Sequence, residues 1–126
     1  MLRKVKVANG IVQGLSAADP RITSFKGIPF AAPPVGENRW RAPQPANDWN
    51  GVLKAFEFAP ISMQAKTVID ENNIYTREWN VDPDIYMDED CLYLNVWTPA
   101  CSENEKLPVF VWYFGGALQF GNTAEM

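Results

Sequence analysis

The sequence offers one candidate for binding an anion through backbone amides. The apolar run 108–114 ends abruptly in Gly115, Gly116 and Ala117. A buried strand that ends in small residues places bare N–H groups at the carboxyl edge of a sheet, where open α/β folds bind their ligands. In acyl transfer, donors of this kind stabilise the developing oxyanion by roughly 3 to 4 kcal/mol each. A Gly-Gly pair also marks ordinary turns, so the rest of the chain must decide between the two interpretations.

The sequence lacks the motif and the general base that usually activate a serine to attack an ester. The chain has no histidine, which removes the usual general base. A serine on a sharp strand-to-helix turn lies in the pattern G-x-S-x-G, and none of the four serines has both glycines: Ser16, Ser24, Ser62 and Ser102. We therefore expect no nucleophile, acid or base in this chain.

Neither a metal nor a cofactor is predicted. With only two cysteines, Cys91 and Cys101, and no histidine, the chain lacks the commonest zinc ligands. A run of five carboxylates lacks the glycine and the final glutamate of a calcium-binding loop and predicts a solvated acidic turn with at most one ion-paired residue. These carboxylates are Asp82, Asp84, Asp88, Glu89 and Asp90.

The elements before this run are short strands and an ordered loop. Residues 5–13 alternate around Asn9-Gly10, a pair that predicts a tight antiparallel hairpin. Residues 22–30 form a third strand candidate and lead into a proline-rich loop. Because large aromatic side chains usually pin a loop to a surface, we expect Trp40 and Trp49 to anchor it.

The second half of the chain predicts one short helix and two strands. The helix falls somewhere in the polar stretch 62–79, and the strands cover 92–97 and 108–114. The last strand is continuously apolar, β-branched and aromatic, which is typical of a strand covered on both faces in the middle of an α/β sheet.

Charge and hydropathy exclude two classes of partner. The net charge is −4, and the basic residues are scattered except for Arg3, Lys4 and Lys6. Nucleic-acid binding needs clustered positive charge, and no apolar stretch approaches the roughly 18 residues that cross a bilayer. We expect a cytoplasmic protein with reduced cysteines that binds neither nucleic acid nor membranes.

Three blocks of the chain follow a known pattern, in the same order and at plausible separations. They are GIVQG (10–14) with FKGIPFAAPPVGENRWRAPQP (25–45), EDCLYLNVWTP (89–99) and PVFVWYFGGALQFG (108–121). These blocks resemble the amino-terminal pattern, the E-D-C-L-Y-L-N-V-x-x-P signature and the oxyanion-hole strand and loop of the type-B carboxylesterase and cholinesterase family, in a para-nitrobenzyl-esterase-like form. Together they span most of the chain.

The resemblance implies a fold and a partner. The fold class would be α/β: the N-terminal part of an α/β-hydrolase fold, with an antiparallel hairpin and the first strands of the central mixed sheet. Residues 1–126 would be the N-terminal portion of a single carboxylesterase domain, incomplete without the remaining polypeptide. We expect that C-terminal remainder as a second polypeptide, from a cleaved or split gene; a truncated reading frame is the alternative.

The resemblance also implies roles for single residues. Gly116 and Ala117 would supply the oxyanion-hole N–H groups, and Gly115 the flexible first position of the loop. Arg39 and Glu89 match positions that form a buried ion pair in relatives, which would neutralise two charges taken out of water.

Three departures from the family pattern carry their own expectations. Phe114 replaces a frequent histidine and should alter loop packing rather than abolish activity. Ala117 replaces the third glycine, and its donor survives provided that the position does not need a positive φ. Cys91 matches a family cysteine whose upstream partner is here Ser62, so that bridge cannot form.

Three functions follow from this sequence. The first is a carboxylic ester hydrolase component that acts with a serine acyl-enzyme whose triad lies outside the chain, with a small carboxylic ester as substrate; the chain alone is predicted to be inactive. The second is a non-catalytic cholinesterase-like binding protein or an inactive truncated fragment. The third is a standalone binding module unrelated to esterases, which a folded monomer of this chain alone would indicate.

Overall fold

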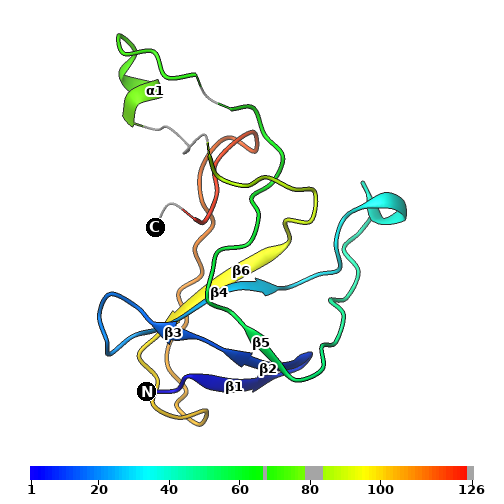
Figure 1. Cartoon of the computed structure of the whole chain (residues 1–126), viewed down its shortest axis with the longest axis vertical. Coiled ribbons are helices and arrows are strands. Elements are labelled where there is room, and N and C mark those ends of the chain that lie inside the picture. Colours follow the sequence, from blue (N-terminus) through cyan, green and yellow to red (C-terminus); the bar gives the residue numbers. More distant parts are fainter. Residues whose placement is uncertain (67, 79–83, 125–126) are drawn as a thin grey trace.

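The structure of the chain is a computed structural model that describes residues 1–66, 68–78 and 84–124 (Figure 1). It begins with an antiparallel hairpin of β1 (Lys4–Val7) and β2 (Gly10–Gln13). The predicted hairpin is confirmed, but its two-residue turn is Ala8-Asn9, because Val7 pairs with Gly10. Expecting the turn at Asn9-Gly10 was therefore wrong by one residue.

Gly10 is needed inside the strand rather than in the turn. Its φ is +151°, and a Cβ at this position would lie 2.5 Å from Nε1 of Trp49. The Trp49 indole N–H donates to the carbonyl of Ile11 at 2.9 Å. Trp49 therefore holds the segment before β5 (Val52–Lys54) against the hairpin, and β5 adds to β2 as a parallel strand. The first sheet has the order β1-β2-β5.

The second sheet carries the segment that leads to the candidate site. Its order is β3 (Leu15–Ser16), β4 (Thr23–Pro29) and β6 (Tyr93–Thr98), and both pairings are antiparallel. The strands expected over 22–30 and 92–97 are therefore confirmed within one residue at either end. A register shift between Phe25 and Ile28 accommodates Gly27 at φ +72°.

The buried core lies between the two sheets and is small. Val12 of β2, Phe25 of β4 and Ala55 after β5 form its centre, and Val12 is completely buried. Trp49 and Leu53 pack partly buried against these residues. Each buried aliphatic or aromatic side chain contributes roughly 1.5–3 kcal/mol. A core with this small number of residues therefore stabilises the two sheets only modestly.

The proline-rich loop is anchored at Trp49, as predicted, but not at Trp40. It contains a single 3-10 turn, η1 (Gly36–Asn38), and Trp40 beyond it is 98% exposed. The expectation that Trp40 pins the loop is wrong. The polar side chain of the preceding residue, Arg39, holds the loop instead, through an ion pair described below.

The predicted short helix is α1 (Ile74–Glu78), which projects from the sheets on a long excursion (Figure 1). It has five residues. Within the described ranges, no helix has the length and apolar character needed to span a bilayer.

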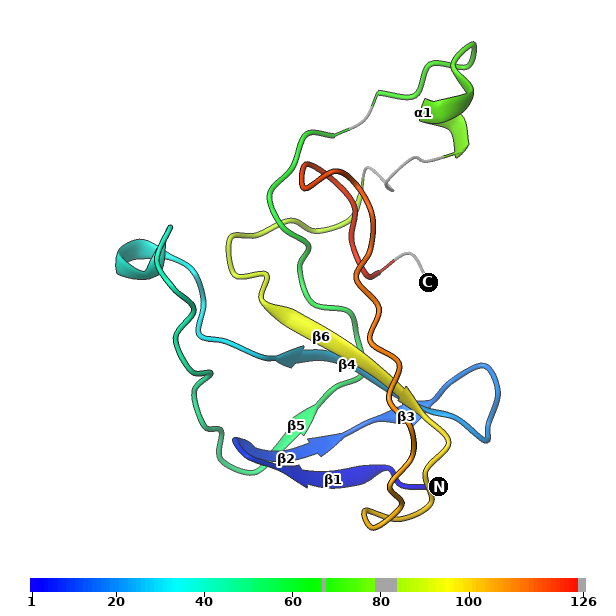
Figure 2. The same cartoon turned by 180° about the vertical axis from the view of Figure 1, so that it is seen from behind.

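The last predicted strand differs most from expectation. Residues 108–114 run from the turn near the N-terminus toward the C-terminal loop, as the orange trace of Figure 2 shows. They belong to neither sheet, and Val109, Phe110 and Tyr113 are each 85% exposed. The prediction of a strand covered on both faces is wrong for this structure. A central strand needs hydrogen-bonding neighbours on both sides, and neither three-stranded sheet extends to this segment.

Candidate active site

The candidate site is the closed loop 115–121 that follows the exposed apolar segment (red in Figure 2). The carbonyl oxygen of Gly116 accepts hydrogen bonds from the amides of Gln119 at 3.0 Å and Phe120 at 3.3 Å. A Cβ added to Gly121 would lie 2.6 Å from the carbonyl oxygen of Gly115, so the two ends of the loop touch. The loop is thus a compact unit closed by its own hydrogen bonds and by contact between its ends.

The backbone of this loop is left-handed at three successive residues. The φ angles are +133° at Gly116, +53° at Ala117 and +61° at Leu118. With the bond from Gln119 to Gly116, positive φ at Ala117 and Leu118 is the signature of a type I′ turn, which glycine, asparagine and aspartate favour. The position of Ala117 thus does need a positive φ, contrary to the condition set for it; alanine nevertheless adopts that φ, so its amide remains available as a donor. Alanine is held here in a conformation that costs roughly 1–2 kcal/mol for a residue with a Cβ.

The glycine at position 116 is required by space as well as by φ. A Cβ built there would collide with the carbonyl oxygen of Phe120 and would lie 2.8 Å from its carbonyl carbon. These are backbone atoms of the same closed loop, so they cannot move aside as the tip of a side chain can. Gly115, by contrast, has open space around the position of a Cβ.

The two candidate donors are free of partners in the described part of the chain. Neither the amide of Gly116 nor that of Ala117 takes part in the backbone hydrogen bonds that close the loop. The hydrogen bonds that close the loop are donated by the amides of Gln119 and Phe120, and both are accepted by the Gly116 carbonyl. The arrangement can therefore offer two backbone N–H groups to an acceptor atom from outside.

Two side chains that the sequence analysis missed hold the far end of the loop. Gln64 accepts a hydrogen bond from the amide of Gly121 at 2.8 Å and donates one to its carbonyl oxygen at 3.1 Å. Asn95 of β6 donates to Oγ1 of Thr123 at 3.0 Å and accepts from the amide of Gly27 at 2.9 Å. Neither partner is local in sequence, and no periodicity or composition signal points to them.

Phe114 lies against this end of the loop. Its ring atom Cδ2 would be 3.0 Å from a Cβ added to Gly121. The aromatic ring therefore covers Gly121, the glycine that Gln64 binds. A histidine at position 114 would present a hydrogen-bonding group there instead.

Arg39 and Glu89 form a two-point ion pair between the proline-rich loop and the acidic turn. Nε of Arg39 lies 2.7 Å from Oε1 of Glu89, and Nη2 lies 2.5 Å from Oε2. The hydrogen bond from Arg39 lowers the pKa of the Glu89 carboxyl below its usual range. The side chains are 50% and 45% exposed, so the pair is half-exposed and the expectation of a buried pair is wrong for this structure. Its role is to tie two loops together.

Two further carboxylates of the acidic run, Asp88 and Asp90, also have local partners, whereas Asp82 lies outside the described residues. The amide of Asp90 and the hydroxyl of Tyr86 both donate to Asp88, and they hold the pKa of its carboxyl down. The hydroxyl of Tyr93 donates to Asp90 at 3.0 Å. Burial first, and this bond second, raise the pKa of Tyr93 to about 12.

The two cysteines are free thiols. Cys91 is half-buried, and burial, followed by the charge of Asp90, raises the pKa of its thiol. A protonated thiol is a poor nucleophile.

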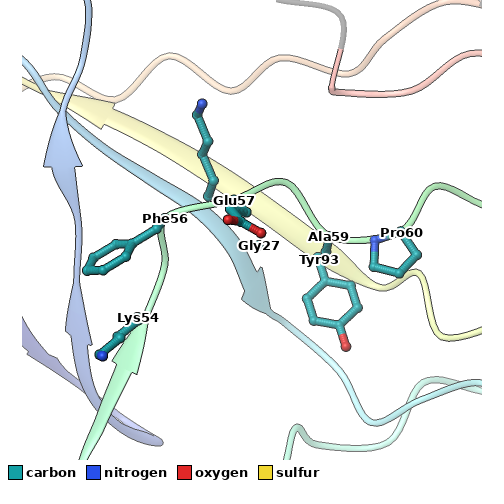
Figure 3. Close-up of a pocket in the computed structure, with 8 residues that line it drawn as sticks. Gly27, Lys54, Phe56, Glu57, Ala59, Pro60 and Tyr93 are labelled. Carbon is teal, nitrogen blue, oxygen red and sulfur yellow. The ribbon is translucent and has the colours of Figure 1, made fainter. Parts of the chain in front are cut away.

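A shallow depression of about 350 Å³ lies between β4, β5 and β6 (Figure 3). Lys54 and Phe56 flank it on one side, and Pro60 and Tyr93 on the other. None of the residues 115–121 lines it. It is therefore separate from the candidate donors.

Comparison with known proteins assigns the chain to a family. The model of the carboxylesterase family matches residues 2–126. A medium-chain fatty acyl-CoA hydrolase precursor of Anas platyrhynchos is 44% identical over 110 residues, which cover 85% of this chain and 19% of that protein. An acetylcholinesterase of Bungarus fasciatus is 39% identical over 120 residues, which cover 94% of this chain and again 19% of the relative.

Solved structures agree with the sequence matches. The structure of PNB esterase superimposes on 96% of this chain with a TM-score of 0.75 and 33% identity, and 23% of its own length is covered. The chain thus spans about a fifth of the length of the proteins that it matches. The chain belongs to the carboxylesterase family, and its strands are the N-terminal part of an α/β-hydrolase fold.

Proposed function

We propose that this chain supplies the oxyanion hole of a serine carboxylic ester hydrolase. The single observation that carries the proposal is that the amides of Gly116 and Ala117 have no partner among the described residues, in a loop where the Gly116 carbonyl is already satisfied. Membership of the carboxylesterase family makes an ester the natural substrate class.

The proposed reaction divides its groups between two stretches of polypeptide. A serine outside this chain attacks the ester carbonyl, its proton passes to a histidine, and the carbonyl electrons move onto oxygen. The amides of Gly116 and Ala117 donate to that oxygen, together with the amide after the serine. Collapse expels the alcohol, which takes the proton, and water then hydrolyses the acyl-enzyme. Each donor in such a site contributes about 10²–10³ in kcat.

We infer that the remainder of the esterase domain completes the site. Residues 1–126 are then the N-terminal portion of a single domain, and the C-terminal remainder is its partner. The exposed apolar segment 108–114 supports this, because it has the composition of a central strand and has no paired strand among the described residues. Buried Asn122 adds support: its Nδ2 has no acceptor in the described part of the chain, and an unsatisfied buried donor costs about 1–3 kcal/mol.

The test is to isolate the polypeptide that carries the remainder together with this chain and to sequence it for G-x-S-x-G. The complete protein should hydrolyse nitrophenyl esters, and a serine-directed phosphonate should label one serine and stop turnover. Absence of both labelling and turnover removes the enzyme and favours a non-catalytic binding protein. The chain alone should show neither.

A further inference from the structure

We propose that Gln64 is a positioning residue that sets the place of the oxyanion-hole amides, an inference that rests on the proposed function. It comes from a segment 57 residues before its partner Gly121, and it contacts that residue through both of its amide atoms.

The contact is specific for a carboxamide. Oε1 of Gln64 accepts the Gly121 N–H at 2.8 Å, and Nε2 donates to the Gly121 carbonyl at 3.1 Å. Only a group with a donor and an acceptor side by side satisfies both backbone atoms of one residue. A methyl or thioether group of the same length satisfies neither.

The segment before Gln64 is itself fixed. Ile61 is buried, its amide donates to the carbonyl of Tyr86 at 3.0 Å, and its carbonyl accepts from the amide of Asp88 at 3.0 Å. Gln64 follows this anchored residue by three positions. Its side chain therefore extends from a fixed point in the fold toward the loop.

Holding Gly121 also holds the opposite end of the loop. Gly121 packs directly against the carbonyl of Gly115, and the turn from Gly116 to Phe120 is closed by its own hydrogen bonds. The candidate donors at Gly116 and Ala117 belong to this closed unit. A shift of Gly121 therefore shifts the donors, and a displacement of about 1 Å at a reacting centre costs about 10²-fold in rate.

The test compares three variants in the complete esterase, with kcat expressed per serine titrated by the phosphonate. Gln64→Met should lower kcat by about 10- to 100-fold and leave KM within about threefold, since the oxyanion forms only in the transition state. Gln44→Met is the matched control: within the described part of the chain, the side chain of Gln44 bonds only the carbonyl of Ala42, two residues away, and the substitution should leave kcat unchanged. A kcat within twofold of the wild type in Gln64→Met overturns the proposal.

Gln64→Glu gives a second readout that a purely structural role would not move. The ionised carboxylate accepts from Gly121 N–H but repels its carbonyl, whereas the protonated acid donates to it as the amide does. The ratio of variant to wild-type kcat should therefore rise as pH falls toward the pKa of the introduced carboxyl. A ratio that does not change with pH overturns the proposal.

Hydrogen exchange separates failure of the contact from failure of the proposed function. The Gly121 amide should exchange faster in Gln64→Met than in Gln44→Met, whether or not the protein turns over esters. Equal exchange rates overturn the contact itself. If the wild-type protein shows neither labelling nor turnover while the two variants differ in exchange as expected, the proposed function is refuted, and with it the role of Gln64 in positioning the donors.

Discussion

Gly116→Ala is the sharpest test of the candidate site. The substitution adds one methyl group at a backbone with φ +133°, where that methyl would collide with the Phe120 carbonyl of the same loop. Left-handed or otherwise glycine-favouring backbone costs about 1–3 kcal/mol for a residue with a Cβ, and the collision forces the turn to open. The Gly116 carbonyl then loses its bonds to Gln119 and Phe120, and the neighbouring amides lose their direction.

The expected kinetic effect follows from the loss of one oxyanion donor. It is a fall of about 10²–10³ in kcat, which corresponds to roughly 3–4 kcal/mol of transition-state stabilisation. The assay is nitrophenyl ester hydrolysis by the complete protein, with active serines titrated by a phosphonate. Titration separates a distorted loop from a smaller fraction of folded enzyme.

Gly51→Ala is the control for the backbone effect alone. Gly51 has φ +78°, and no atom lies within 4 Å of an added Cβ. This variant should lose about 1 kcal/mol of stability and keep its kcat. If Gly116→Ala retains kcat within about threefold of the wild type, the amides of this loop are not the oxyanion donors and the reasoning is refuted.

Three further predictions use other parts of the chain. Ala117→Gly should stabilise the protein by about 0.5–1 kcal/mol, because relief of the left-handed φ of +53° exceeds the entropy cost of glycine; a urea midpoint that falls at constant m would contradict this. Glu89→Gln should destabilise the protein at neutral pH and have little effect in acid. Arg39 lowers the pKa of Glu89 in the folded protein. The ion pair therefore contributes its full stability above the unfolded pKa of about 4.3 and loses it as pH falls through the folded pKa. Equal losses of unfolding free energy in urea at pH 7 and pH 3 would count against the pair. In an absorbance titration of the tyrosines, Tyr93→Phe should remove a step near pH 12, since burial and Asp90 raise the pKa of Tyr93 to about 12. If the variant instead loses a step near pH 10, Tyr93 does not have that environment.

Local patterns were sufficient for most of the strands. Alternation at 5–13 and the β-rich runs at 22–30 and 92–97 predicted β1, β2, β4 and β6 within one residue, apart from the position of the first turn. The short β3 and β5 were not predicted. They have two and three residues, too few for a period to register, and each exists because a longer strand is available to pair with it.

The candidate site was predictable only in part. The small residues after an apolar run indicated where donors could lie, and the family resemblance named Gly116 and Ala117. The sequence could not predict whether position 117 needs a positive φ, since that depends on how the loop closes on Gly121. Gln64 was invisible for the same reason, because its contact spans 57 residues.

What the sequence determined by itself is the set of local choices: where strands alternate, where prolines and glycines end them, and which motif follows the last apolar run. Tertiary structure decided which distant groups meet, such as Arg39 with Glu89 and Gln64 with Gly121, and left residues 108–114 outside both sheets. The physical reason is that φ preferences and periodicity act between near neighbours, whereas burial and strand pairing depend on partners brought together by the whole fold.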